Sequence, residues 1–298
     1  GQDPVVDKLA RVRAALAQAG ADSLVLSTLD DIAWLTNLRG ADLACTPVFT
    51  AYAAITPSAA LLFADKARFS AEALASLSAS GVELLDYERA RTEIPARLSG
   101  CTTLLDPAKT SQDLFEVLQA AGIRTIERAQ PTELIKSRRT AGELALLRET
   151  MRRDGAAMCE LLAWIARMVH EEKTFTELDV SRKLRQLRAE IPGFMSLSFE
   201  TIAAAGEHAA LPHYQPTQET NAEIRPGDLL LIDSGGQYEG GTTDITRTIA
   251  VGEPSAAQRR DFTAVLRGHI LLASTHFPQG TFASQLDTLA RMPIWEIG

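Results

Sequence analysis

Apolar residues are spaced in two different ways along the chain. Up to about residue 130, short apolar runs alternate with stretches that have helical spacing. The runs predict strands at residues 22–27, 47–55, 59–65, 82–87 and 101–106, and a Thr-Pro-Ser turn joins the second of these to the third as a hairpin. Strands that alternate with helices are typical of an α/β domain. We therefore expect residues 1–135 to form an α/β domain with a mixed sheet.

Longer helical patterns begin after Pro131, which interrupts the first pattern. Thr140 and Glu143 have the spacing of a capping box, and an amphipathic helix follows them. Thr176 and Asp179 begin a second helix in the same way. Strands are then predicted at residues 194–204, 228–233 and 242–251, and helices at about 255–276 and 282–291. We expect residues 136–298 to form a second, α+β domain, with the boundary between about 130 and 140.

The composition excludes several classes of protein. Hydrophobic residues make up 46% and charged residues 23%, as in a soluble globular protein, and no apolar run approaches the ~20 residues of a membrane span. The 30 Lys and Arg residues against 38 Asp and Glu give a net charge of −8, which disfavours binding to nucleic acid. The three cysteines are odd in number and far apart, which indicates a reducing, cytoplasmic compartment.

The strongest candidate for chemistry is a pair of carboxylates that follows an apolar run. Asp233 ends the run and Asp244 comes eleven positions later, after a glycine-rich turn. If the turn is centred on Tyr238–Glu239, the two aspartates face each other across a hairpin, with Cβ atoms about 4.5–5.5 Å apart. Two bare carboxylates at that separation repel, so a shared proton, a cation or a metal must compensate.

Two readings of this pair remain open from the spacing. A pair of divalent ions about 3.5–4 Å apart fits between such ligands, and oxygen ligands favour Mn²⁺ or Mg²⁺. In the other reading, Asp233 caps a turn and Asp244 accepts a hydrogen bond from a neighbouring threonine, because Asp-Ser-Gly-Gly is also ordinary turn chemistry.

Two histidines upstream of the pair are further candidates. His208 and His213 lie in the segment GEHAALPHYQPT, and a histidine beside a metal can move protons or stabilise an oxyanion. The alternative is that both are ordinary loop residues. The remaining histidines have helical surroundings and are interpreted as ordinary helix residues: His170, His269 and His276.

The segment LPHYQPTQETNAEIRPGDLLLIDSGGQYEGGTTDITRTIAVGEPS, residues 211–255, resembles the first half of the metal site of Xaa-Pro aminopeptidase (aminopeptidase P), a pita-bread-fold metallopeptidase. The segment STLDDIAWLTNLRGADLACTPVFTAYAAI, residues 27–55, resembles the second domain of the long, three-domain form of that family. The resemblance covers almost the whole chain. It implies a creatinase-N-like α/β domain followed by a partial pita-bread domain.

The resemblance also implies roles for individual residues. Asp233 would bind one metal ion, Asp244 would bridge two, and His213 would contact the substrate and assist proton movement. The implied cofactors are two divalent metal ions, most commonly Mn²⁺. The implied reaction is hydrolysis of the bond between an N-terminal residue and a following proline, so the substrates are peptides with proline at the second position. A homodimer is a further implication.

One part of the family pattern has no counterpart in this sequence. The family completes its site with a later histidine and two glutamates, and no residue after Asp244 lies in a matching context. We therefore expect the 298 residues to represent the second domain and the first half of the catalytic domain, without a complete site, and with Trp295 and Ile297 uncovered. A metal-free, creatinase-like hydrolase and a non-catalytic pita-bread scaffold are the alternatives. The two aspartates argue against the first; the incomplete site favours the second, whereas the two aspartates and His213 argue against it.

Overall fold

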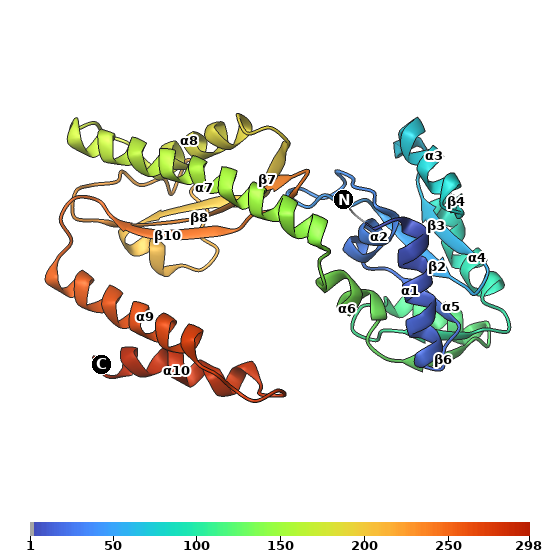
Figure 1. Ribbon diagram of the computed structural model, residues 1–298. Helices are drawn as coiled ribbons and strands as arrows, with labels where there is room; N and C mark the ends of the chain where they lie inside the picture. The colour runs from blue at the N-terminus through green and yellow to red at the C-terminus, as the bar shows by residue number, and fades with distance from the viewer. Residues whose placement is uncertain (1–2) are drawn as a thin grey trace. The chain divides into compact units, whose positions relative to one another are not determined.

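The computed structural model describes residues 3–298 (Figure 1). Contacts divide the chain into two compact units. One unit runs up to Met151 and includes Gln237–Thr242, and the other comprises Arg152–Gly236 and Thr243–Gly298. Within residues 3–298, no helix is both long enough and apolar enough to cross a membrane.

The first unit is built on a six-stranded sheet in the order β4-β3-β2-β1-β5-β6. Its strands are β1 (Ser23–Leu26), β2 (Ala51–Ile55), β3 (Ala60–Ala64), β4 (Val82–Leu85), β5 (Thr102–Leu105) and β6 (Arg124–Glu127). β2 is antiparallel to β1 and to β3, whereas the other neighbouring pairs are parallel. The mixed sheet and the β2–β3 hairpin predicted from the sequence are confirmed.

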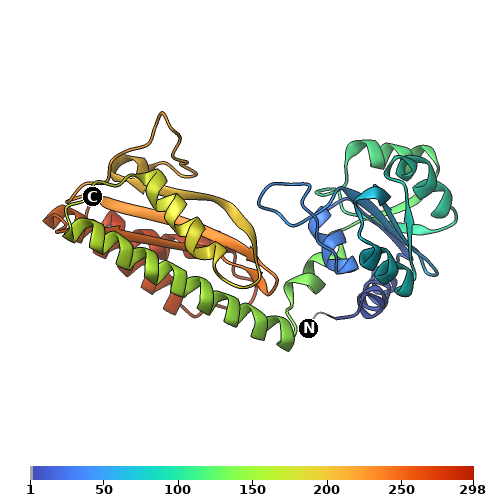
Figure 2. The same cartoon turned by 90° about the horizontal axis from the view of Figure 1, so that it is seen from above.

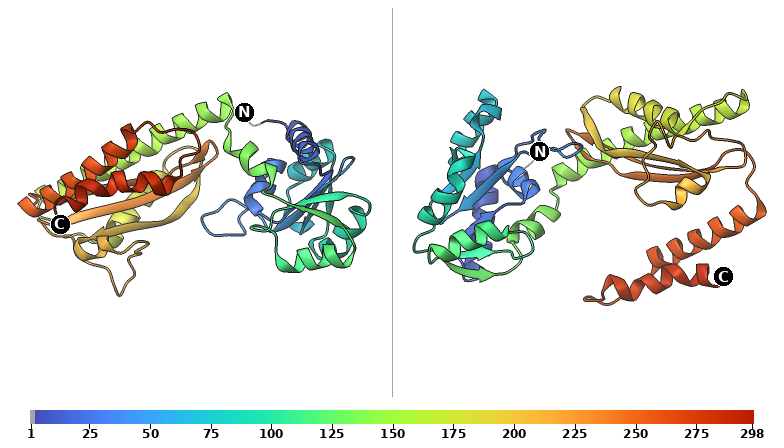
Figure 3. Two further views of the ribbon diagram at one scale, coloured as in Figure 1. Left: turned by 90° about the horizontal axis from the view of Figure 1, so that it is seen from below. Right: turned by 180° about the vertical axis from the view of Figure 1, so that it is seen from behind.

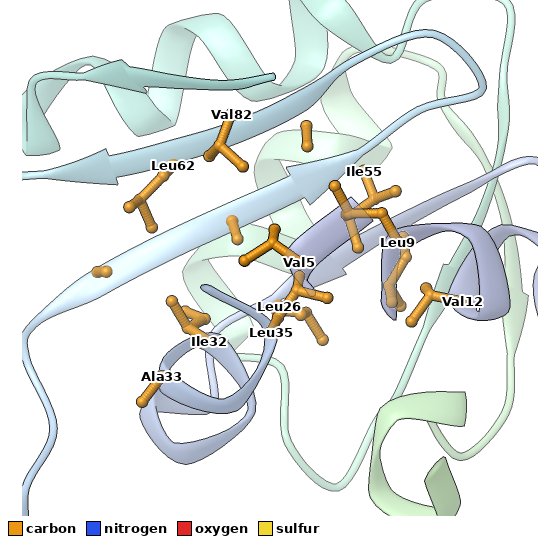
Figure 4. Packing of buried hydrophobic residues seen from close by; sticks show 14 of the residues in the cluster. Val5, Leu9, Val12, Leu26, Ile32, Ala33, Leu35, Ile55, Leu62 and Val82 are labelled. Atoms are coloured by element: carbon orange, nitrogen blue, oxygen red, sulfur yellow. The ribbon is translucent and has the colours of Figure 1, made fainter. Parts of the chain in front are cut away.

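Helices cover both faces of this sheet (Figure 2). They are α1 (Val5–Gln18), α2 (Leu29–Thr36), α3 (Ala71–Ala79), α4 (Ala90–Arg97), α5 (Gln112–Ala120) and α6 (Pro131–Ser137), with 3₁₀ turns η1 (Lys66–Arg68) and η2 (Tyr87–Arg89). Successive strand residues point to opposite faces. Leu24 and Leu26 therefore pack with residues of α1 and α2, while Val25 joins the core beneath α4 and α5. Figure 4 shows Leu26 in this cluster. Burial on both faces explains why β1 is apolar almost throughout.

The second unit is formed by the later elements and has a sheet with one covered face. They are α8 (Glu177–Ala189), β7 (Phe194–Ala205), η3 (Gly206–Ala210), β8 (Leu229–Tyr238), β10 (Ile245–Ala250), α9 (Ala256–Ser274) and α10 (Ala283–Trp295), and the long helix α7 (Ala141–His170) leads into them. The last two residues of β8 and the short strand β9 (Gly241–Thr242) fall in the first unit. The strands follow the order β10-β8-β7, with β9 paired to β8. α7 and α8 pack on the face of β8 that carries Leu230 and Ile232, which are both fully buried. Asp233 therefore lies on the opposite, open face.

α9 and α10 pack against each other, as two further views show (Figure 3). Gly268 permits their close approach, because a Cβ atom at this position would lie 2.1 Å from the carbonyl oxygen of Ala290. Both helices expose large apolar side chains: Phe262, Val265, Leu266, Ile270, Leu271, Met292, Ile294 and Trp295. Trp295 and Ile297 are 61% and 38% exposed, but they lie at the end of α10 and not at the edge of a sheet as expected.

Candidate metal centre

The two candidate aspartates lie on one hairpin, but they do not face each other directly. In the antiparallel β8–β10 ladder, Thr246 pairs with Asp233. Continued residue by residue, this register places Asp244 opposite Gly235. The predicted direct opposition of Asp233 and Asp244 is therefore wrong.

The position of the turn explains this difference. Tyr238 pairs with Gly241, so Glu239 and Gly240 form a two-residue turn that is centred one residue later than predicted. Moving the centre by one residue shifts the pairing by two. Because side chains alternate with a period of two, a shift of two changes the partner of each residue but keeps its face of the sheet.

Burial supports the placement of both carboxylates on the open face. Thr243 and Ile245 are buried, whereas Asp244 and Thr246 between and after them are exposed. The hydroxyl of Thr246 donates a hydrogen bond to Oδ1 of Asp233 over 2.7 Å, so these two side chains share a face. Thr243 and Asp244 connect β9 to β10 without belonging to either strand, and Asp244 directly precedes β10, so it lies about two ladder positions from Asp233.

The hydrogen bond from Thr246 belongs partly to the alternative reading, in which the carboxylates are satisfied locally. The threonine hydroxyl, however, donates its hydrogen bond to Asp233, whereas that interpretation expected a threonine to bond to Asp244. A carboxylate offers about four lone-pair sites, so one hydroxyl leaves Asp233 with capacity to bind a cation.

The glycine that follows Asp-Ser in this motif, Gly235, is required by the close approach of a neighbouring backbone segment. A Cβ atom at this position would lie 2.0 Å from the carbonyl oxygen of Thr243 and 2.2 Å from Oγ of Ser198. Ser198 itself donates a hydrogen bond to that carbonyl over 3.0 Å. Only glycine fits, because the backbone beside Asp244 occupies the space of a side chain.

The two candidate histidines have different surroundings. His213 is exposed, lies between η3 and β8, and has a positive φ of 64°. His208 contacts the buried carboxylate of Glu177 through Nδ1 at 2.9 Å and stacks on Tyr214 with ring centroids 4.4 Å apart. His208 is thus engaged in a structural contact, and Glu177 is a residue that the sequence pattern did not single out.

The residues described here meet only part of the requirement for a two-ion centre. Asp233 and Asp244 are oxygen ligands of the kind that Mn²⁺ and Mg²⁺ prefer. Each ion of a pair needs roughly four to six ligands. Among residues 3–298, no group of three or more His, Cys, Asp or Glu side chains is placed to hold a metal ion. By themselves these residues do not fit two ions.

Comparison with known proteins defines the class of this fold and site. The profile of metallopeptidase family M24 matches residues 145–298, and that of the creatinase/prolidase N-terminal domain matches residues 2–143. The chain belongs to metallopeptidase family M24, and it combines a creatinase-type N-terminal domain with a pita-bread domain of mixed α and β structure.

Similar proteins include several aminopeptidases. Aminopeptidase P2 of Arabidopsis thaliana is 34% identical over 99% of this chain and 45% of its own length. Xaa-Pro aminopeptidase 2 of Sus scrofa is 38% identical over 93% of this chain and 42% of its own length. The crystal structure of X-prolyl aminopeptidase from Caenorhabditis elegans, described as a cytosolic enzyme with a di-nuclear active site, matches with a TM-score of 0.93 and 30% identity over 99% of this chain and 49% of that one. The chain thus spans about half the length of the relatives that it matches.

Proposed function

We propose that this chain is the carboxylate-bearing part of a metal-dependent aminopeptidase that removes an N-terminal residue from a following proline. The observation that carries this proposal is the placement of Asp233 and Asp244 on one open face of the β8–β10 hairpin. The names of the similar proteins support the reaction and the substrate, peptides with proline at the second position.

The residues of the chain would divide the work as follows. Asp233 would hold one divalent ion, and Asp244 would contribute a ligand to each of two ions. The remaining ligands would have to come from residues other than these two aspartates. Ions bound there would polarise the scissile carbonyl. The imidazole of His213 can both donate and accept a proton, and its exposure leaves it open to a peptide.

Several finer features belong to the same proposal. We propose Mn²⁺ as the metal, because it prefers oxygen ligands such as these two carboxylates. A cytoplasmic location follows the cysteine pattern and the cytosolic relative, and a homodimer is the proposed assembly. We also propose the domain boundary near residue 135, with a creatinase-N-like domain over 1–135 and pita-bread structure over 136–298.

The proposal is tested by peptide hydrolysis with the product of the complete gene, and with the 298-residue chain assayed beside it. With Mn²⁺ present, we expect release of alanine from Ala-Pro-Pro and none from Ala-Ala-Ala, because the pocket must accept a proline nitrogen that carries no hydrogen. Asp244→Asn should abolish the release, whereas Asp261→Asn, an exposed aspartate on α9, should not. Equal rates on both peptides, or hydrolysis that persists without divalent metal, would contradict it.

A further inference from the structure

A buried carboxylate on α8 accepts hydrogen bonds from the loop that carries His213 and from the residues beside it. Glu177 is the first residue of α8 and is completely buried. Burial of a carboxylate is unfavourable unless hydrogen bonds compensate it, and the positive end of a helix dipole favours it at this position. Because burying this carboxylate removes it from water at a cost in free energy, its position calls for a structural or functional reason.

Four donor groups surround Glu177. Its Oε1 accepts from the backbone nitrogen of Ala205 over 2.8 Å and contacts Nδ1 of His208 at 2.9 Å. Its Oε2 accepts from the hydroxyl of Tyr214 over 2.8 Å and from the backbone nitrogen of Ala222 over 3.0 Å. Each carboxylate oxygen therefore has two polar partners.

These partners bracket the segment 206–221, which we call the His213 loop. Ala205 immediately precedes the loop, Ala222 immediately follows it, and His208 and Tyr214 lie within it. One side chain therefore closes the loop at both ends and fixes it at two points between. The backbone nitrogen of Glu177 adds a further tie, since it donates to the carbonyl oxygen of Ala222 over 3.1 Å.

The tie at Tyr214 acts directly on His213, which is the preceding residue. A positive φ is uncommon for a residue with a side chain and persists only where the surroundings impose it. Tyr214 is buried, and its burial raises the pKa of its hydroxyl, so that the hydroxyl remains a donor to Glu177. The residue next to His213 in the chain is thus fixed to Glu177 through its side chain.

We infer that Glu177 is the positioning residue of His213: its buried carboxylate gathers Ala205, Tyr214 and Ala222 and so sets where the His213 imidazole is presented. The existence of the anchor is independent of the enzymatic assignment. Its purpose rests on the proposed function, in which His213 meets the peptide.

Glu177→Gln is the sharpest test because it preserves shape and removes half of the acceptor capacity. The amide nitrogen of glutamine is a donor, so in either orientation it faces the backbone nitrogen of Ala205 or that of Ala222, which are also donors. We expect amide hydrogen exchange at that residue and through the His213 loop to quicken about tenfold or more, since a hydrogen bond to a charged group is lost. Glu190→Gln, an exposed glutamate at the other end of α8, is the matched control and should change nothing.

Tyr214→Phe separates positioning from general stability. It removes one hydroxyl and keeps the aromatic ring, so the fold should survive and Ala205 should stay protected, while exchange rises between residues 211 and 222. The ¹⁵N imidazole signals of His213 should be single and sharp in the unmodified chain and should shift or multiply in both variants. A purely structural role would leave the His213 signals unchanged at equal thermal stability.

Two results would overturn the inference: unchanged exchange in the His213 loop of Glu177→Gln, or faster exchange that is equally large in α7 and β8. A titration with Ala-Pro-Pro, read at the His213 imidazole, separates the two proposals. If exchange responds to Glu177 but the peptide leaves His213 undisturbed, the anchor stands and the role of His213 in the proposed function fails.

Discussion

Replacement of Gly235 by alanine should be far more damaging than its size suggests. The added methyl carbon would lie 2.0 Å from a backbone oxygen, that of Thr243, and 2.2 Å from Oγ of Ser198. The serine hydroxyl can rotate away, but the backbone oxygen moves only if the hairpin distorts. Overpacking of this kind costs typically 1–3 kcal/mol, and contact with backbone places Gly235→Ala at the upper end, at about 3 kcal/mol.

Replacement of Gly155 by alanine should instead increase stability. Gly155 lies inside α7, and nothing occupies the space of its missing Cβ within 4 Å. Alanine is favoured over glycine in a helix by about 1 kcal/mol, so Gly155→Ala should stabilise the second unit. At roughly 4 °C per kcal/mol for a unit of this size, calorimetry should show melting lowered by about 12 °C in Gly235→Ala and raised by about 4 °C in Gly155→Ala.

Gly235→Ala should also disturb the aspartate pair, because Thr243 is the residue before Asp244. A melting temperature within about 2 °C of the unmodified chain would refute the close approach at this position, since it corresponds to less than about 1 kcal/mol. Destabilisation by both substitutions would show instead that the response reflects alanine and not the local geometry.

Three further predictions concern the rest of the chain. Arg188 and Asp154 form a fully buried ion pair, with Nε to Oδ1 2.7 Å, so Asp154→Ala should reduce the free energy of unfolding by about 3–5 kcal/mol, whereas the double change Asp154→Leu with Arg188→Met should be nearly neutral in urea titrations. Gly268→Ala should separate α9 from α10, lowering their helical circular dichroism on heating, because of the 2.1 Å approach to Ala290. Burial lowers the pKa of Lys8 from 10.5 to about 8, so the unfolded chain binds this proton more tightly than the folded chain does. The free energy of unfolding of the first unit should therefore rise as the pH rises from 8 to 10.5. Lys8→Met should lack this rise, and a difference in unfolding free energy between the two chains that stays constant with pH would contradict the prediction.

Local sequence signals predicted most of the elements well. The capping boxes at Thr140–Glu143 and Thr176–Asp179 are confirmed, with both reciprocal hydrogen bonds present in each. They are predictable because all partners lie within three residues. Pro131 was misleading: it does not end a structured stretch but occupies the first position of α6, where its missing N–H is harmless.

The site was less predictable because its geometry depends on distant partners. The hairpin register follows from one turn, and an error of one residue in the turn centre moved Asp244 from Asp233 to Gly235. Both aspartates still lie on the same face of the sheet, because a shift of two residues in the pairing does not change the face to which a side chain points. The role of Glu177 was invisible, because its partner Ala222 lies 45 positions away and offers only a backbone nitrogen.

Whether Asp233 and Asp244 bind metal together is tested by titration with Mn²⁺, followed by the paramagnetic broadening of amide signals, which detects even weak binding. The signals of Asp233, Asp244 and Thr246 should broaden first, and Asp233→Asn or Asp244→Asn should remove the effect, whereas Asp261→Asn should retain it. Broadening centred elsewhere in the chain, or a response that survives both substitutions, would contradict the claim that these two carboxylates bind metal together.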